Sequence, residues 1–460
     1  MRRELLSFAL MLAAPVARAQ VSDVSADATA RTIAENTAPV LETIYDFNGS
    51  PVGFPMQLTM AADGNLYGVT AGMDLIYHVP GSAFRIRPPA QPGGPWIEEL
   101  LHTFTGDDGI SPQAVAMHDG ILYGTTYSGG AMGNGTAFTL TPPKPPGGEW
   151  IEAVLYSFDY VTGSPNPRLA FGDNGELYGT TQEFFPALGT VFELIPPAQP
   201  GGQWTETSLH EFLGGPNDGA APQAGVVLRG GILYGTTSAG GTGTGEYCSG
   251  GCGTVWAMPL PASTERSPDS TPGLKILYSF QGPPDDGNLP RAVLVTDNNG
   301  FLYGTTFAGG SATACGGDGC GTAFALQPPS APGGEWAETV LYNFTDTPND
   351  GSKPSGLALG PHGVLYGTSD GWSNDAEGAC ADTAPYAPAC GTLFSLHPPA
   401  IEGGAWTEAP VHVFTDAPSQ GLYPMGALAI GRDAAGGPLL YGVTAIGGTS
   451  NYGTAYTVSP

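Results

Sequence analysis

Four long polar side chains stand after a repeated proline, where they could bind a ligand. Each proline opens a short apolar segment, as in "PRAVLVTD" from Pro290, and the next residue is a glutamine or an arginine in four copies: Gln113, Arg168, Gln223 and Arg291. Arginine offers paired planar donors that suit a carboxylate or a sugar hydroxyl, and glutamine offers neutral donors. We therefore regard these four as ligand-binding candidates. Ion pairing with neighbouring aspartates is the alternative for the two arginines.

Four aspartates at a second repeated position could hold a metal ion. Each precedes the glycine of an Asp-Gly-x-x-Pro segment: Asp108, Asp218, Asp286 and Asp350. A carboxylate at such a turn commonly accepts hydrogen bonds from local backbone N–H groups. Ca²⁺ is the alternative, because it binds clustered carboxylate and carbonyl oxygens. We expect structural turns here, with Ca²⁺ as the one candidate ion and no other cofactor.

The six cysteines form three close pairs at one equivalent place in the sequence repeat. The second member of each pair directly precedes a Gly-Thr dipeptide, and no paired histidines accompany them. Zinc would need four converging ligands, so metal binding and free thiols are the weaker alternatives to oxidation. We expect three local disulfides: Cys248 with Cys252, Cys315 with Cys320, and Cys380 with Cys390.

Other residues that could perform catalysis have simpler explanations. His102, His210 and His412 stand where other copies of the repeat have tyrosine, so they are interpreted as packing rings. Ser369 lies in "GTSDG", which matches the nucleophile pattern Gly-x-Ser-x-Gly, but this is the repeated "YGTT" with serine in place of threonine. That pattern also needs a following helix, which the sequence does not predict. No catalytic residue is predicted.

A repeat containing Leu-Tyr-Gly must position all of these residues. It occurs seven times, 55 to 75 residues apart, with its tyrosines at Tyr67, Tyr123, Tyr178, Tyr234, Tyr303, Tyr366 and Tyr441. Each copy contains four strand-like runs: the proline segment, "LYGTT", an aromatic segment such as "GTAFALQPP", and a final run such as "WAETVLYNF". Helical periodicity is missing after the N-terminal segment. The sequence therefore predicts an all-β, seven-bladed β-propeller with four antiparallel strands per blade and the proline strand innermost.

The two ends of the repeat region predict how the ring closes. The sequence ends at Pro460 after a third-type strand, whereas "LETIYDF" (41–47) is a fourth-type strand that precedes the first proline segment. We expect this N-terminal strand to complete the last blade. The Asp-Gly-x-x-Pro segments and the loops after "YGTT" then share one face, called the top face below, where the candidate side chains surround the channel mouth.

Composition indicates export and argues against two classes of partner. The formal net charge is −28, which disfavours binding to nucleic acid or to an anionic membrane surface. Residues 1–19 combine basic residues, an apolar run and a small-residue cleavage site near Ala19, which together predict a signal peptide. No later stretch is apolar enough to form a transmembrane segment. We expect a flexible segment at 20–40, a propeller at 41–460, a secreted or periplasmic location and a monomer.

With its motifs "LYGTT", "GTxF" and "PGGxW", the sequence resembles the bacterial exported tandem-repeat proteins of the GloVer (choice-of-anchor) type. The resemblance covers residues 41–460 and implies export, a propeller-like fold and variable surface anchoring. It supplies no catalytic residues. We therefore expect a non-catalytic, exported propeller that binds a glycan, a peptide or a surface protein through its top face. The alternative is an exported propeller enzyme, of lyase or lactone hydrolase type, with its site at the channel mouth.

Overall fold

The computed structural model describes the repeat region with short gaps. The described residues are 39–49, 53–72, 80–91, 93–145, 147–182, 188–199, 201–245, 247–261, 273–331, 333–347, 349–370, 390–401, 403–415, 420–433 and 435–460. The expected signal peptide (1–19) and nearly all of the segment 20–40 lie outside them, as does Cys380. No helix in the described part is long and apolar enough to cross a membrane.

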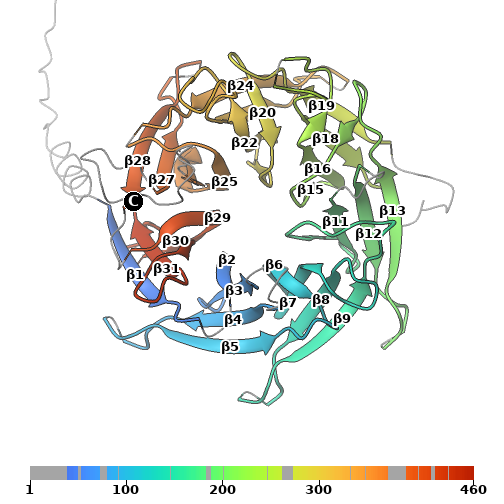
Figure 1. Cartoon of the computed structure of the whole chain (residues 1–460), viewed down its shortest axis with the longest axis vertical. Helices are drawn as coiled ribbons and strands as arrows, with labels where there is room; N and C mark the ends of the chain where they lie inside the picture. Colours follow the sequence, from blue (N-terminus) through green and yellow to red (C-terminus); the bar gives the residue numbers. More distant parts are fainter. Residues whose placement is uncertain are drawn as a thin grey trace, which may run out of the picture. The chain divides into compact units, whose positions relative to one another are not determined.

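Seven antiparallel sheets form a ring, which confirms the predicted propeller (Figure 1). Six sheets have four strands, and the sheet of blade 5 has five because its innermost strand is divided into two. Blade 1 contains β2 (Phe54–Met60), β3 (Leu66–Ala71), β4 (Ser82–Arg87) and β5 (Ile97–Thr103). Blade 2 contains β6 (Ile110–His118), β7 (Ile121–Ser128), β8 (Thr136–Thr141) and β9 (Ile151–Ser157). Blade 3 contains β10 (Ala170–Phe171), β11 (Leu177–Thr181), β12 (Thr190–Ile195) and β13 (Thr205–Glu211).

The remaining blades follow the same order with small additions. Blade 4 contains β15 (Val227–Arg229), β16 (Ile232–Thr237), β18 (Thr254–Pro259) and β19 (Lys275–Ser279), beside the short pair β14 (Gly219–Ala220) and β17 (Ala239–Gly240). Blade 5 contains β20 (Gly287–Pro290), β21 (Val295–Thr296), β22 (Leu302–Gly309), β23 (Thr322–Gln327) and β24 (Ala337–Asn343). Blade 6 contains β25 (Pro354–Leu359), the 3-10 turn η1 (Pro361–Gly363), β26 (Leu365–Ser369), β27 (Thr392–His397) and β28 (Thr407–Val413).

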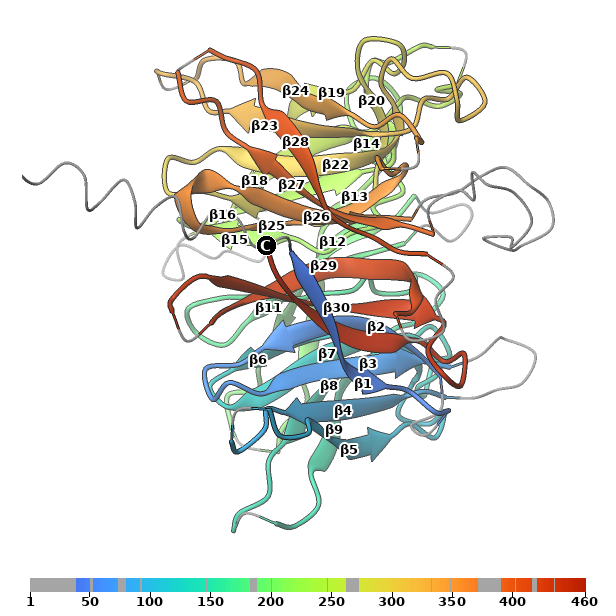
Figure 2. The ribbon, with the colours of Figure 1, turned by 90° about the vertical axis from the view of Figure 1, so that its left-hand side faces the viewer.

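The seventh blade joins the two ends of the propeller. It contains β29 (Leu422–Arg432), β30 (Pro438–Ile446), β31 (Thr454–Ser459) and the N-terminal β1 (Val40–Asp46). β1 pairs antiparallel with β31, from Val40 opposite Ser459 to Asp46 opposite Thr454 (Figure 2). The predicted closure by the N-terminal strand is confirmed, with the strand beginning and ending one residue earlier than expected.

Hydroxyl pairs explain why each copy repeats threonine. In every blade the last hydroxyl residue of "YGTT" meets the first hydroxyl residue of the third strand at 2.7 to 3.0 Å. The pairs are Thr70–Ser82, Thr126–Thr136, Thr181–Thr190, Thr237–Thr254, Thr306–Thr322, Ser369–Thr392 and Thr444–Thr454. These pairs are buried, so each hydroxyl needs a partner that the other supplies. Ser369 therefore has the structural position of a repeat threonine.

Aromatic side chains fill the contacts between neighbouring blades. The Leu-Tyr-Gly tyrosine of one blade packs against the tryptophan of the next, as Tyr67 does against Trp150 at 6.0 Å and Tyr303 against Trp406 at 6.1 Å. The glycine of the same tripeptide leaves room for the third-strand ring, as Gly68 does for Phe84. Leu-Tyr-Gly is therefore a packing unit for blade contacts, which accounts for its seven copies.

Candidate functional site

The innermost strands enclose a cavity of about 320 Å³ in the central channel. Most of its lining is aliphatic, contributed by β2, β6, β25 and β29 and including Leu58, Val115, Leu357 and Leu428. Its polar lining residues are Gln57, Thr59 and Arg168, and the Thr59 hydroxyl already donates to the Val115 carbonyl at 2.6 Å. Arg168 is the one charged residue in this lining.

Arg168 protrudes into the channel from the segment before β10. The residue keeps an exposed surface, yet the protein around it lowers the pKa of the guanidinium by burial. Together these features describe a group that protrudes into an enclosed but water-accessible space. No carboxylate in the described part of the chain lies within ion-pairing distance of it. Its φ of 71° lies in the left-handed region, which carries a strain cost for a non-glycine residue.

The other three candidates have different surroundings. The Arg291 guanidinium carbon lies 4.4 Å from the centre of the Phe307 ring. No ion pair is found for Arg291 within the described residues. Gln223 donates from Nε2 to the Ser238 hydroxyl at 3.3 Å. The Gln113 side-chain oxygen is buried and has no hydrogen-bond partner among the described residues. All four follow the innermost prolines as predicted from the sequence, and their assignment to a ligand remains a proposal.

The backbone after the innermost proline differs between the two sides of the ring. In blades 1, 2 and 6 the strand continues past the proline with a register shift of the kind made by a β-bulge. In blades 3, 4 and 5 the pairing resumes only at Ala170, Val227 and Val295. Arg168, Gln223 and Arg291 all lie in these unpaired segments. Irregular backbone of this kind redirects side chains and is common beside binding sites.

The four aspartates hold turns together. Each carboxylate accepts a backbone N–H from the start of its own loop: Asp108 from Thr105 (2.7 Å), Asp218 from Leu213 (2.9 Å), Asp286 from Gln281 (2.7 Å) and Asp350 from Thr345 (2.9 Å). These bonds run back along the chain, whereas an Asx-turn would run forward. Each carboxylate is also hydrogen-bonded to an aromatic side chain of the preceding strand. The distances are 2.7 Å to His102 Nε2, 3.1 Å to His210 Nε2, 2.8 Å to the Tyr278 hydroxyl and 3.1 Å to the Tyr342 hydroxyl.

A glutamate of the next blade lies beside the ring of the preceding blade in five places, and in three of them it also lies beside one of the four aspartates: Glu152 with Asp108, Glu338 with Asp286 and Glu408 with Asp350. It stands four residues before the ring of its own fourth strand: Glu98, Glu152, Glu206, Glu338 and Glu408. We call the contact between each such glutamate and the ring of the preceding blade, together with the repeat aspartate where there is one, the outer seam. Burial raises the pKa of Glu152, Glu206 and Glu408 to about 7 and that of Glu338 to about 8, and nearby aspartates add to the effect. Leu41 and Leu274 occupy this position in the other two blades.

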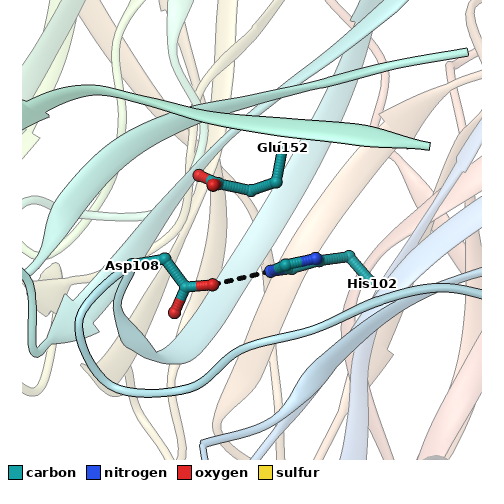
Figure 3. A group of neighbouring side chains, drawn as sticks. All are labelled: His102, Asp108 and Glu152. Carbon is teal, nitrogen blue, oxygen red and sulfur yellow. Dashed lines mark hydrogen bonds and ion pairs between the residues drawn. The ribbon is translucent and has the colours of Figure 1, made fainter. Parts of the chain in front are cut away.

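One outer seam has three side chains that could ligate a metal. His102, Asp108 and Glu152 bring one ligand atom each to within 4.8 Å of one another (Figure 3). The same arrangement occurs with tyrosine in place of histidine at Tyr278, Asp286 and Glu338. The cluster is therefore explained as a repeated blade contact. Ca²⁺ at the aspartates would compete with the backbone bonds that they already accept.

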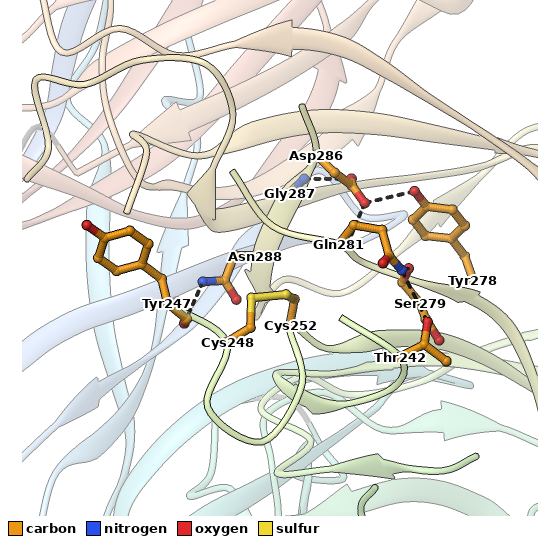
Figure 4. The surroundings of a disulfide bond; sticks show 10 residues. All are labelled: Thr242, Tyr247, Cys248, Cys252, Tyr278, Ser279, Gln281, Asp286, Gly287 and Asn288. Atoms are coloured by element: carbon orange, nitrogen blue, oxygen red, sulfur yellow. Dashed lines mark hydrogen bonds between the residues drawn. A yellow bond between two sulfur atoms is a disulfide. The ribbon is translucent and has the colours of Figure 1, made fainter. Parts of the chain in front are cut away.

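Two of the expected disulfides are formed in top-face loops. Cys248 is bonded to Cys252 and Cys315 to Cys320. Figure 4 shows the first beside Asn288, whose Nδ2 donates to the Tyr247 carbonyl at 3.3 Å. Cys390 is also disulfide-bonded, but its expected partner Cys380 lies outside the described residues. That third pairing stays a prediction.

The sequence interpretation missed a second cavity, of about 580 Å³, between blades 3 and 4. Glu176, Tyr178, Leu228 and Leu260 contribute to its lining. The Tyr178 hydroxyl donates to the buried carboxylate of Glu193 at 2.8 Å. Blade 4, like blade 7, lacks the fourth-strand tryptophan that in other blades packs on the tyrosine of the preceding blade. The missing tryptophan and the acidic Glu193 in the third strand of blade 3 are the two sequence features that could have indicated this cavity.

Two solved structures show partial similarity to the chain. A putative oxidoreductase (glucose dehydrogenase) from Thermus thermophilus is 16% identical over 73% of this chain and 94% of its own, with a TM-score of 0.39. A protein of unknown function from Dyadobacter fermentans is 10% identical over 91% of this chain and 97% of its own, with a TM-score of 0.42. No curated protein matches the chain.

A family model matches nearly the whole repeat region and agrees with the family that the sequence motifs predicted. The model describes the Gloeobacter/Verrucomicrobia repeat and matches residues 29–248 and 244–460. The two matches together cover all seven copies of Leu-Tyr-Gly. The chain therefore belongs to the Gloeobacter/Verrucomicrobia repeat family.

Proposed function

We propose that this protein is an exported, non-catalytic binding module whose central channel holds an anionic or hydroxylated group of a glycan, a peptide or a surface protein. The observation that carries the proposal is Arg168, a guanidinium in an otherwise largely aliphatic channel cavity with no carboxylate partner in the described part of the chain. The ligand approaches from the top face, where the inner segments of blades 3, 4 and 5 leave the regular sheet.

The guanidinium of Arg168 carries a positive charge inside the channel cavity. Arg168 keeps contact with water, but the protein around it replaces part of its hydration, which disfavours the charged form and lowers the pKa of the guanidinium. An anion that enters the channel offsets this cost and gains a charge-assisted hydrogen bond, worth about 1.5 to 3 kcal/mol. The planar donors of arginine can bind both oxygens of one carboxylate. A ligand carboxylate therefore fits Arg168 better than a hydroxyl alone does.

Export is part of the same proposal. The N-terminal features that predict a signal peptide with cleavage near Ala19 support it. The disulfides of blades 4 and 5 support it too, because such bonds persist in oxidising compartments. A secreted or periplasmic protein would meet glycans, peptides and surface proteins as its available partners.

The test is a binding screen of the mature protein against glycans and small carboxylic acids. Any ligand found is then titrated against Arg168→Met, which keeps the length of the side chain and removes its charge. We expect about tenfold or greater loss of affinity, the equivalent of one charged hydrogen bond. The control is Arg229→Met, which alters a bottom-face arginine bonded to the Asn298 carbonyl. Equal affinity in Arg168→Met and the unmodified protein would place the site elsewhere.

A further inference from the structure

Positive charge on the top half of the propeller gathers around the channel. Arg168, Arg291 and Lys353 all adjoin the innermost prolines, at the top ends of the first strands. The other described cations lie towards the bottom, at the ends of third strands, the starts of fourth strands or the bottom turns: Arg85, Arg87, Lys144, Arg229, Lys275 and Arg432. In a chain of net charge −28, such clustering creates a local attraction for anions.

Two of these cations share one aromatic ring. The Arg291 guanidinium lies 4.4 Å and the Lys353 ammonium 5.2 Å from the centre of the Phe307 ring. Burial lowers the pKa of both groups, and the charge of Arg291 lowers that of Lys353 further. Asp318, Asp346 and Asp370 act in the opposite direction on Lys353. The ring thus holds two like charges together at the rim of blades 5 and 6.

The backbone of Lys353 is fixed by a disulfide loop. Its N–H donates to the Cys320 carbonyl at 2.8 Å, and Cys320 is bonded to Cys315. Its φ of 54° lies in the left-handed region, as do those of Ser111, Ala221, Leu289 and Tyr423 at the same repeat position. Lys353 is therefore held at a defined place beside Arg291, which reduces the entropy lost when a ligand binds.

We infer that the ligand carries two carboxylate groups, one bound by Arg168 inside the channel and the other by Arg291 and Lys353 at the rim. This inference rests on the proposed function and adds Lys353 to the site. Arg168 lines the channel cavity from blade 3, whereas the rim pair belongs to blades 5 and 6, so the two positive centres come from different blades. Asp318, Asp346 and Asp370 act on Lys353 at this rim, and their negative charge disfavours a long polyanion. The ligand class is a short dicarboxylate or a peptide that ends in an acidic residue.

The experiment compares dicarboxylates with monocarboxylates by calorimetric titration of the full mature protein. The probes are succinate, glutarate and adipate, with butyrate as the monocarboxylate. We expect the best-fitting dicarboxylate to bind about tenfold or more tightly than butyrate, from one added charged hydrogen bond. Lys353→Gln and, separately, Arg291→Gln should reduce the affinity for the dicarboxylate more than the affinity for butyrate. Arg168→Met should weaken both ligands, and Lys275→Gln, on the outermost strand, should weaken neither.

The outcomes separate this inference from the proposed function. Dicarboxylates that bind no more tightly than butyrate, or an advantage that survives both rim substitutions, would overturn the inference and leave an Arg168-dependent site standing. Failure of all carboxylates and neutral glycans to bind would reject the proposed function itself. A peptide ending in aspartate, tested beside its C-terminal amide, identifies the source of the two carboxylates. Weaker binding of the amide would show that the C-terminal carboxylate and the aspartate side chain are the two groups bound. Equal binding of the two peptides would contradict this.

Discussion

We expect the free energy of unfolding of this protein to fall as the pH rises from about 5 to 8, because the glutamates of the outer seam have raised pKa values. Glu338 is the clearest case, because burial raises the pKa of its carboxyl from 4.5 to about 8 and the charge of Asp286 adds to the effect. A carboxyl with a raised pKa in the folded state stabilises the protein below the unfolded-state pKa. That contribution is lost as the pH passes from about 4.5 to about 8, because the unfolded chain releases its proton first.

The size of the effect follows from the shift and from the position of Glu338. A shift from 4.5 to about 8 corresponds to about 5 kcal/mol at full value. Since this side chain is only partly buried, screening by water reduces the value to about 1 to 2 kcal/mol. Glu152, Glu206 and Glu408 act in the same direction. His412 opposes them, because burial lowers its pKa and stabilises the neutral ring as the pH rises.

The assay is equilibrium unfolding in guanidinium chloride at pH 5 and pH 8, followed by tryptophan fluorescence. The glutamine of Glu338→Gln is uncharged at both pH values. The free energy of unfolding of this variant should therefore exceed that of the unmodified protein by about 1 to 2 kcal/mol at pH 8 and be close to it at pH 5. The matched control is Glu335→Gln, an exposed position three residues away that should retain the full decline. An unchanged midpoint between the two pH values, or an equal decline in Glu338→Gln, would refute the reasoning.

Three further predictions concern the ring, the seam and the cysteines. A chain that starts at residue 50 lacks β1 and should unfold at a lower temperature than the mature protein, and an unchanged melting temperature would contradict closure by β1. His102→Tyr should change the free energy of unfolding by less than about 0.5 kcal/mol, because tyrosine makes this bond in other seams, whereas His102→Ala should cost about 1 to 3 kcal/mol by urea titration. Equal losses in both variants would contradict this equivalence. Peptide mapping without reduction should link Cys380 to Cys390, and a link between different blades would disprove the local pairing.

The repeat made the architecture predictable because each strand type carries its own marker. Proline lies at the start of the innermost strand, and a glycine directly precedes the third strand, as Gly253 does with a φ of 97°, which strains any other residue. The unpaired fourth strand at the N-terminus then required closure with the end of the chain. These inferences depend on local residue types and on counting strands, both of which the sequence displays directly.

The polar contacts were less predictable because they join residues from different copies. His102 was interpreted as a packing ring, and it does lie edge-to-face with Phe104 at 4.9 Å. Its bond to Asp108 and its approach to Glu152 depend on how neighbouring blades are rotated, which no single copy of the repeat reveals. Lys353 was missed for the same reason, since the ring that it shares with Arg291 comes from the second strand of another blade.

The inner segments that leave the regular sheet after the proline belong to blades 3, 4 and 5. The unpaired inner segments hold Arg168, Gln223 and Arg291, and Lys353 adjoins the last of them across the rim. A regular inner strand would commit these backbone groups to the sheet and fix each side chain by the two-residue alternation. Without strand pairing, each side chain can point in a direction that the sheet would not allow. The lost backbone hydrogen bonds reduce stability, and the hydroxyl pairs and aromatic contacts of the rest of the ring offset this loss. The repeated residues therefore maintain the ring, and the irregular inner segments are where a ligand site can evolve without weakening it.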